Sequence, residues 1–481
     1  MSATPSQQRQ LQHLYHRAAF GISLAEMRTK ITQNRSQWVE ELFKEANNYT
    51  PINEVDEFTS RAEARQEFLQ MTPEQRKEAI KKALKEGRER IKRINEVWLT
   101  RMYSNTAALR ERMTLFWHGH FACQFKDAFL AQEQINIIRQ NALGKLKDLM
   151  MAVAKNPAMI LFLNNQQNKK AHPNENFARE LMELFTIGRG NYTEQDIKEA
   201  ARAFTGWAIN KDTGKYQFNE KTHDFDPKTF MGKTGNFNGD EIIDIILEQP
   251  QTALYITKKI YQYFVKDDIT QKNHQTRIEQ LAKTFKQNSY DIGALMKQIF
   301  MADWFYEEEN IGSKIKSPVD LMMSLQKHFN LQYLDHSAPM FIQKVLGQMI
   351  LYPPNVAGWA GGRAWIDSNT LLFRLQLPEF LLKAAELNVS AKDDGDVNND
   401  GLVNNKLKKL QVSNDWSVLL THFKAIENPE TRFAKMTEYL LQTTQQPDWT
   451  TMKTFLDISS DETHIQSLAL AIASLPEYQM C

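Results

Sequence analysis

The sequence predicts an all-α protein: a predominantly helical, multi-helix globular body with one long irregular loop. Apolar residues recur at helical spacing through most of the 481 residues. Helix start signals accompany them, as where Thr72 can serve as N-cap, Pro73 as N1 and Gln75 as the capping-box residue. Only residues 208–240, rich in Gly and in alternating aromatic residues, break this pattern. They predict a long loop with space for a short β-hairpin.

The helix predicted to start at Thr72 combines a narrow apolar stripe with a basic surface. The stripe consists of Ile80, Leu84, Ile91, Ile94 and Trp98. The other faces carry nine Lys or Arg against three Glu between Arg76 and Arg93. This charge fits a nucleic-acid or phosphate surface or an ordinary solvated face. We favour the solvated face, because no interleaved aromatic residues could stack on bases.

Further helices follow from the same periodicity. They are predicted within residues 105–117, 132–155, 193–207, 240–249, 250–265, 290–305 and 316–329. In one of them Thr193 can cap the start with Asp196 three residues later, and Gly206 marks the exit. Together these elements predict a main helical domain at 1–388, an irregular segment at 389–407 and a C-terminal helical segment at 408–481. We expect the last to pack on the main domain.

Composition describes an ordinary globular protein. Hydrophobic residues make up 42%, charged residues 24%, and the formal net charge is +1, so nothing global points to nucleic acid or an anionic membrane as partner. The two cysteines, Cys123 and Cys481, form neither a disulfide framework nor a CxxC zinc pattern. No signal peptide and no apolar run of about 20 residues is readable, so we expect a cytoplasmic protein without membrane insertion.

Several long motifs together resemble the large bacterial family catalogued as domain of unknown function 1800. The resemblance extends from about Leu11 to Gln479. The motifs are HLYHRAAFG, FWHGHF, NFARELMELFTIGRGNYTEQDIKEAARAFTGW, HDFDPKTFMGKTGNFNGDEIIDIIL, IKSPVDLMM, PPNVAGWAGGRAWIDSNTLLFR and ALAIASLPEYQ. The resemblance implies a shared fold but no established activity. Members commonly look exported, and they are often encoded beside a family resembling alkaline phosphatases and sulfatases, which implies a functional partner of that class.

The stretch ENFARELMELF, Glu175–Phe185, is amphipathic on a helical wheel of 100° per residue. Arg179 stands four residues from both Glu175 and Glu183, a spacing at which ion pairs form on a helix surface. Glu180 and Glu183 lie along one polar edge. This edge is either a solvated helix face or one wall of an active site. We predict that Glu180 and Glu183 are catalytic and face an enclosed polar cleft, with Arg179 bridging the carboxylates at its edge.

The histidines of FWHGHF predict a metal site under one condition. On a continuous helix His118 and His120 would point about 200° apart and could not bind one ion. If Gly119 ended the helix, both rings could lie on the same side. His223 and Asp224 in the long loop would complete a site for a divalent transition metal of unknown identity. The alternatives are a hydrogen-bonded core histidine and ordinary turn-forming aspartates.

The segment DVNNDGLVNN resembles the first part of an EF-hand calcium loop. Asp396, Asn398 and Asp400 occupy alternate positions, and Gly401 permits the sharp turn. Leu407 stands where the bidentate acid belongs, so only weak calcium binding is expected. The alternative is a polar linker, and either role is structural.

The segment GWAGGRAWIDSNTLLFR places Trp359, Arg363 and Trp365 among three glycines. Tryptophan, arginine and exposed backbone suit the binding of a sugar or an anion. The alternative is a tight Gly-rich turn closed by buried tryptophans.

Two classes of function follow from these residues. One is a metal-assisted enzyme, a hydrolase rather than an oxidoreductase, in which a metal-bound water is activated and a carboxylate acts as base. The other is a non-catalytic helical binding or assembly protein whose polar motifs are structural. The sequence identifies no substrate for either.

Overall fold

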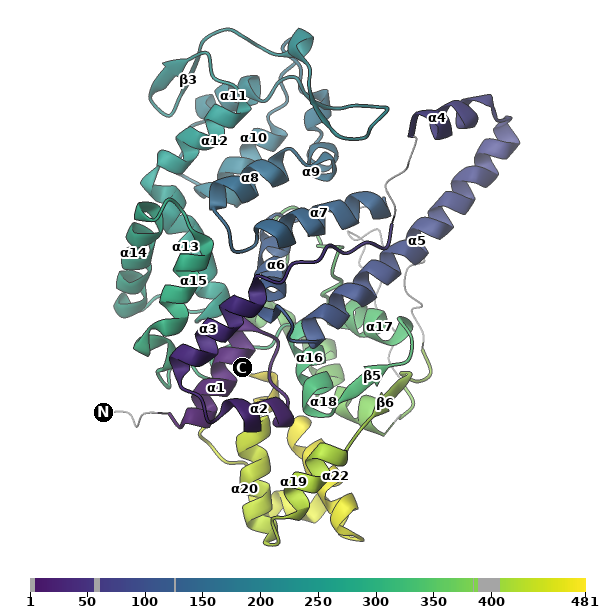
Figure 1. Cartoon of the computed structure of the whole chain (residues 1–481), viewed down its shortest axis with the longest axis vertical. Helices are drawn as coiled ribbons and strands as arrows, with labels where there is room; N and C mark the ends of the chain where they lie inside the picture. The colour runs from purple at the N-terminus through teal and green to yellow at the C-terminus, as the bar shows by residue number, and fades with distance from the viewer. Residues whose placement is uncertain (1–4, 56–60, 125–126, 384, 388–406) are drawn as a thin grey trace.

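The computed structural model describes residues 5–55, 61–124, 127–383, 385–387 and 407–481. Within them the chain is predominantly helical, with three two-stranded sheets, which confirms the predicted all-α class. Figure 1 shows an elongated body in which the first helices and the last ones lie near each other. One cluster of buried hydrophobic side chains extends from Leu11 to Tyr478, so the C-terminal helices share the core of the main body.

The N-terminal third forms the centre of the body. Its helices are α1 (Gln7–Ala18), α2 (Leu24–Lys30), α3 (Arg35–Ala46), α4 (Arg61–Gln70), α5 (Pro73–Tyr103), α6 (Ala108–His120) and α7 (Ala128–Asn141).

The next segment forms the upper end in Figure 1. It contains α8 (Leu146–Ala154), α9 (Pro157–Phe162), η1 (Asn165–Gln167), α10 (Asn176–Glu180), the π-helical turn η2 (Leu181–Thr186), α11 (Glu194–Ala203), β1 (Trp207–Ile209), β2 (Tyr216–Phe218), η3 (Glu220–Thr222), β3 (Lys228–Phe230), β4 (Lys233–Gly235) and α12 (Gly239–Glu248).

The third segment returns to the centre. It contains α13 (Pro250–Phe264), α14 (Lys272–Gln287), α15 (Ile292–Met301), η4 (Asp303–Tyr306), α16 (Pro318–His328), β5 (Leu331–Tyr333), α17 (Ser337–Leu346), η5 (Gly362–Trp365) and α18 (Ser368–Leu382).

The last segment forms the lower end in Figure 1. It contains β6 (Val412–Asn414), α19 (Ser417–Lys424), α20 (Pro429–Leu440), α21 (Trp449–Met452), η6 (Lys453–Phe455), α22 (Asp461–Ala473) and η7 (Pro476–Gln479). Strand β6 pairs antiparallel with β5, and α22 packs against α18, which attaches this segment to the body.

The predicted loop at 208–240 is more regular than expected. It contains two short antiparallel hairpins, β1–β2 and β3–β4. Strand β3 packs on α11, and Thr229 donates its backbone N–H to Glu199 of that helix. Helix α11 thus holds the β3–β4 hairpin in place, and turn residues in the sequence do not predict such a contact.

Helix α5 begins as predicted, with a complete capping box between Thr72 and Gln75. Its apolar stripe, however, is buried only in its second half. Ile91 is 3% exposed, whereas Ile80 and Leu84 are 49% and 54% exposed. Figure 1 shows the reason: the first half of α5 projects beyond the body together with α4.

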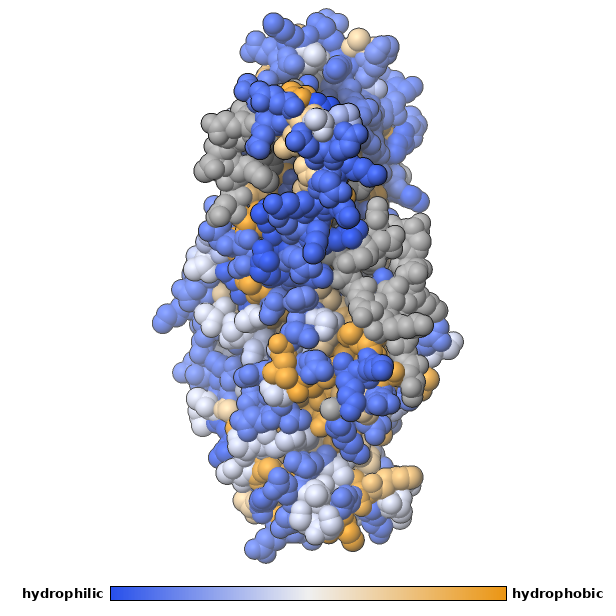
Figure 2. All heavy atoms as spheres, turned by 90° about the vertical axis from the view of Figure 1, so that its right-hand side faces the viewer, coloured by the Kyte–Doolittle hydropathy of each residue, from blue (hydrophilic) through white to orange (hydrophobic). Residues whose placement is uncertain are grey.

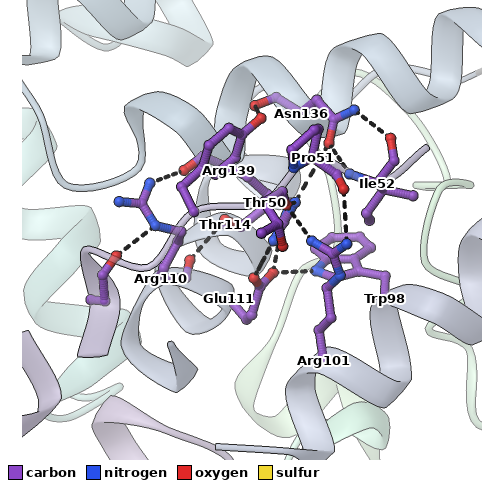
Figure 3. A network of polar contacts seen from close by, with 12 residues as sticks. Thr50, Pro51, Ile52, Trp98, Arg101, Arg110, Glu111, Thr114, Asn136 and Arg139 are labelled. Atoms are coloured by element: carbon purple, nitrogen blue, oxygen red, sulfur yellow. Dashed lines mark hydrogen bonds and ion pairs between the residues drawn. The ribbon is translucent and has the colours of Figure 1, made fainter. Parts of the chain in front are cut away.

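Helix α6 is the central helix, because its residues from Ala108 to His118 are all buried. Glu111 is one of these buried residues. Its carboxylate forms an ion pair with two nitrogen atoms of the Arg139 guanidinium of α7, at N–O distances of 2.6 and 2.9 Å. Trp98 of α5 donates its indole N–H to the same carboxylate at 3.0 Å. Arg139 also donates to the carbonyl oxygen of Thr50 at 2.8 Å. Figure 3 shows how this network ties α5, α6, α7 and the segment after α3 together.

Within the described residues no helix is both long and apolar enough to cross a membrane. The face shown in Figure 2 is mainly hydrophilic, with apolar atoms gathered in one patch in its lower half.

We expect Glu111→Ala to lower the free energy of unfolding by about 3–5 kcal/mol, because it leaves the buried Arg139 guanidinium without its counter-charge. Denaturant titration measures this loss. The control is Lys147→Ala, which breaks an exposed ion pair with Asp244 and should cost less than about 1 kcal/mol. Equal losses for the two variants would contradict the central role of the Glu111 pair.

Candidate functional site

The most developed cavity in the described structure has a volume of about 470 Å³. Its walls come from α6, α13, the start of α16 and the segment 357–365, with single contributions from α1 and from the π-helical turn η2. Most of the motifs by which the chain resembles its family therefore contribute lining residues. Residues far apart in the sequence meet here because α6 crosses the middle of the body.

Two glycines set the shape of this cavity. Gly358 has a φ of +75°, and a Cβ atom there would overlap the carbonyl oxygen of Gly119. The neighbouring Trp359 in turn lies over Gly119, whose Cβ would stand 3.6 Å from the indole ring. FWHGHF and GWAGGRAW are thus two halves of one wall, and glycine is needed where the two backbones touch.

The three residues predicted to bind substrate all border the cavity: Trp359, Arg363 and Trp365. Arg363 is exposed, and within the described part of the chain its guanidinium has no hydrogen bond or ion pair. Trp365 is buried, with 9% of its surface exposed. Their role in substrate binding stays a prediction, whereas the structure shows that all three residues border the same cavity.

The cavity carries more positive than negative side chains. Five cationic side chains line it, against two carboxylates: Arg17, Arg112, Lys259, Lys314 and Arg363, with Asp267 and Asp320. The carboxylates are already paired, Asp320 with Arg112 and Asp267 with Lys314. Lys259 is without a carboxylate partner in the described structure, and its ammonium lies 5.6 Å from the centre of the Tyr255 ring. Burial and the neighbouring Lys258 lower the pKa of Lys259.

Arg17 forms the deepest charged part of the lining, with 1% of its surface exposed. Its Nη2 donates to the backbone oxygens of Asn310 and Cys481, at 3.0 and 2.8 Å. Its Nε and Nη1 are buried without a hydrogen-bond partner in the described structure. Burial lowers the pKa of the guanidinium, against the opposing pull of nearby carboxylates. A buried cation with unused donors favours an anion beside it.

The two histidines of FWHGHF take separate roles, because α6 continues through His120. His118 points into the core, where its Nε2 accepts the backbone N–H of Leu351 at 3.0 Å and its ring meets Trp98 and Trp359. His120 borders the cavity and donates from Nε2 to the carbonyl oxygen of Phe185 at 3.0 Å. Burial lowers the pKa of His118 to about 3 and that of His120 to about 4.

His223 and Asp224 belong to a different part of the molecule. His223 Nδ1 donates to the Thr205 carbonyl oxygen at 2.7 Å, and Asp224 forms an ion pair with Arg202 at 2.7 Å. Both residues fasten the loop to the end of α11.

The predicted transition-metal site is therefore not assembled. Within the residues that the structure describes, no three His, Cys, Asp or Glu side chains come together in a way that could hold a metal ion. The physical reason is that the four predicted ligands, His118, His120, His223 and Asp224, each have another structural partner. The predicted calcium residues Asp396, Asn398 and Asp400 lie outside the described residues.

The glutamate edge of ENFARELMELF also differs from its prediction. Arg179 bridges Glu175 and Glu194, at 3.1 and 2.8 Å, rather than Glu180 and Glu183. Glu183 pairs instead with Arg189 and accepts the Tyr192 hydroxyl at 3.0 Å. Glu180 and Glu183 are half-buried and neither lines the cavity. Burial and the neighbouring Glu183 raise the pKa of Glu180.

The same motif reaches the cavity through its backbone instead. Its second half is the π-helical turn η2, and Leu184 lines the cavity. The carbonyl oxygen of Leu184 accepts the Tyr255 hydroxyl at 2.9 Å, and that of Phe185 accepts from His120. A helical wheel of 100° per residue describes an α-helix and not a π-turn. The sequence analysis therefore expected the side chains of Glu180 and Glu183 at the cleft, whereas the backbone carbonyls of Leu184 and Phe185 make the contacts there.

Several lining residues escaped the sequence analysis: Arg17, Arg112, Tyr255, Lys259 and Lys314. Arg17 was discoverable in principle, because it lies within the motif HLYHRAAFG. Lys259 carries no such signal, since it stands beside Lys258 in an ordinary amphipathic helix.

Comparison with known proteins gives one match. A family model described as a protein of unknown function, DUF1800, matches residues 13–480. No match was found among curated proteins or solved structures.

We expect Gly358→Ala to disturb the cavity wall, because the added Cβ must push the segment 357–365 away from α6. The matched control is Gly347→Ala. Gly347 is left-handed, with a φ of +83°, and has open space around the added atom, so both variants carry the cost of about 1–2 kcal/mol for a positive φ and only Gly358→Ala carries the clash. The emission of the tryptophans beside the cavity should shift in Gly358→Ala alone. Identical spectra would contradict the close approach.

Glu180→Gln should raise the melting temperature at pH 7. Since the folded state raises the pKa of Glu180, the ionised carboxylate is unfavourable above that pKa, and removing its charge relieves the cost. The gain should disappear as the pH falls through the pKa of Glu180, where the parent carboxyl becomes neutral. Melting curves between pH 4 and 8 test this, and a loss of stability at pH 7 would contradict it.

Proposed function

Because the chain belongs to the DUF1800 family of proteins of unknown function, we propose its function from the cavity: the protein binds an anionic organic molecule that contains a ring. The observation that carries this proposal is the excess of cationic side chains over carboxylates around one partly open cavity. Its volume of about 470 Å³ lies within the range of about 300–1,000 Å³ common for small-molecule sites.

We infer the anionic character of the ligand from the cationic side chains of the cavity that have no carboxylate partner. Arg112 and Lys314 have carboxylate partners, whereas Lys259 and Arg363 have none in contact within the described residues. The charge of Arg17 is opposed chiefly by Cys481, whose oxygen it contacts at 2.8 Å, but its Nε and Nη1 have no hydrogen-bond partner in the described structure. Lys259 and Arg363 are exposed and Arg17 is buried with unused donors, so charge attraction at the first two and hydrogen bonds at the third favour a counter-charge in the cavity. A bound anion would supply it, and would raise the lowered pKa of Lys259 again.

We infer the ring of the ligand from the aromatic side chains that line the cavity. Five aromatic side chains border the cavity: Phe116, Tyr255, Tyr263, Trp359 and Trp365. Rings of this kind offer flat apolar faces against which a planar or chair-shaped ring can stack. Aromatic walls combined with a few charged groups are the usual composition of a small-molecule site.

This proposal takes the binding alternative of the sequence analysis. Metal-assisted hydrolysis needs a ligand set that the described residues do not form, because the predicted metal ligands are engaged elsewhere. A transition metal is therefore no part of the proposal. The polar motifs at 175–183 and 223–224 act in it as ion-paired structure.

Binding of phenylacetate and of its neutral analogue phenylacetamide, followed by tryptophan fluorescence or calorimetry, tests the proposal. We expect phenylacetate to bind about tenfold more tightly, as one charge-assisted hydrogen bond contributes about 1.5–3 kcal/mol. Lys259→Ala should remove most of this preference. Lys258→Ala is the matched control, since this neighbouring lysine is exposed like Lys259 but does not line the cavity. Equal binding of the two compounds, or equal effects of the two variants, would contradict the proposal.

A further inference from the structure

His120 borders the cavity, and only one of its two ring nitrogens is engaged in a hydrogen bond within the described structure. A carbonyl oxygen can only accept, so the contact between Nε2 and Phe185 places the proton on Nε2. In the neutral ring Nδ1 is then an acceptor. Within the described residues Nδ1 has no hydrogen-bond partner, and the residue borders the cavity. His118, by contrast, is completely buried.

The surroundings hold the His120 ring in this orientation. The ring stacks on Phe116 with centroids 6.0 Å apart and meets Phe121 edge-on at 4.7 Å. The carbonyl that it bonds belongs to the π-helical turn η2, and the turn is itself fastened by the Tyr255 hydroxyl on Leu184. Tyr255 can approach because Gly188 has no side chain: a Cβ there would stand 2.8 Å from the tyrosine ring. π-Helical turns are frequent at functional sites.

Electrostatics keep the His120 ring neutral. Burial is the main cause that lowers its pKa to about 4; the hydrogen bond to the Phe185 carbonyl opposes this, and the Lys259 ammonium on α13 adds a smaller lowering effect. The Tyr255 hydroxyl and Arg363 line the same cavity, and its carboxylates, Asp320 and Asp267, are engaged by Arg112 and Lys314. At neutral pH the cavity therefore contains a hydrogen-bond acceptor close to an ammonium group.

We infer that His120 accepts a hydrogen bond from a hydroxyl group of the bound anion, so that the ligand of this cavity is a ring-containing hydroxy acid with its hydroxyl near the acidic group. This inference rests on the proposed function, because Lys259 is taken to hold the acidic group. The hydroxyl is inferred from Nδ1 of His120, an acceptor that has no hydrogen-bond partner in the described structure. An acid without a hydroxyl leaves Nδ1 without a partner.

Mandelate and phenylacetate are matched probes, because they share the ring and the carboxylate and differ by one hydroxyl. We expect one enantiomer of mandelate to bind the parent protein about 5- to 10-fold more tightly than phenylacetate. His120→Phe should abolish this preference and leave the affinity for phenylacetate within about twofold, since the phenyl ring fits among Phe116, Phe121 and Phe185. The control His172→Phe changes an exposed histidine outside the cavity and should leave the preference intact.

A second measurement needs no variant. Diethyl pyrocarbonate should acylate Nδ1 of His120 in the parent protein, and still do so at pH 5.5, where a histidine with an ordinary pKa of about 6.5 is mostly protonated. Mandelate should protect it. Peptide mapping identifies the modified residue, with the exposed His172 as the positive control for the reagent at pH 7.

The outcomes separate the two proposals. Equal affinity for mandelate and phenylacetate, a preference that survives in His120→Phe, or a His120 that stays unmodified while His172 reacts would overturn the role of His120. If phenylacetate binds better than phenylacetamide in the same experiments, the anion site itself still stands. Failure of both acids to bind would overturn the anion site and this inference with it.

Discussion

The structure depends on the buried ion pair between Glu111 and Arg139, because it holds the central helix α6 in place. A helix that is buried on all sides has no solvated face to accommodate charge, so every charged group on it needs a fixed partner. Glu111 takes Arg139 and the Trp98 indole, and Arg112, one residue later, takes Asp320 of α16. Adjacent residues thus attach α6 to opposite sides of the body, which fixes both its rotation and its position along its axis.

The rotation of α6 decides what happens at its C-terminal end. With the helix continuous through His120, His118 must point into the core and His120 toward the cavity. The glycine between them then lies where the segment 357–365 can approach, and Gly358 and Trp359 close the wall. The cavity is therefore a consequence of how α6 is held.

The sequence predicted the fold class, the capping boxes and the importance of two Gly-containing motifs, because these depend on local patterns that a single segment contains. The helical geometry of the sequence also gave the condition for the metal hypothesis: on a continuous helix, His118 and His120 cannot bind one ion. Helix α6 is continuous through His120. The sequence could not predict which side chain each polar group pairs with in the folded protein. Arg179 pairs with Glu175 at the expected helical spacing, but its second partner is Glu194 of the next helix, and Glu183 pairs with Arg189. The π-helical turn was not predicted either; one of its carbonyl oxygens, that of Leu184, accepts a hydrogen bond from Tyr255 of α13, a contact far away in the sequence.

The central claim is that the unpaired cations of the cavity hold an anionic, ring-containing ligand. A crystal structure with 4-bromophenylacetate tests this most directly, because the anomalous signal of bromine locates the ring independently of the carboxylate density. The account predicts bromine beside the aromatic walls formed by Trp359 and Trp365, and the carboxylate within hydrogen-bond distance of Lys259 or Arg17. A cavity that stays free of the compound at saturating concentration, or a carboxylate turned away from both cations, would contradict it.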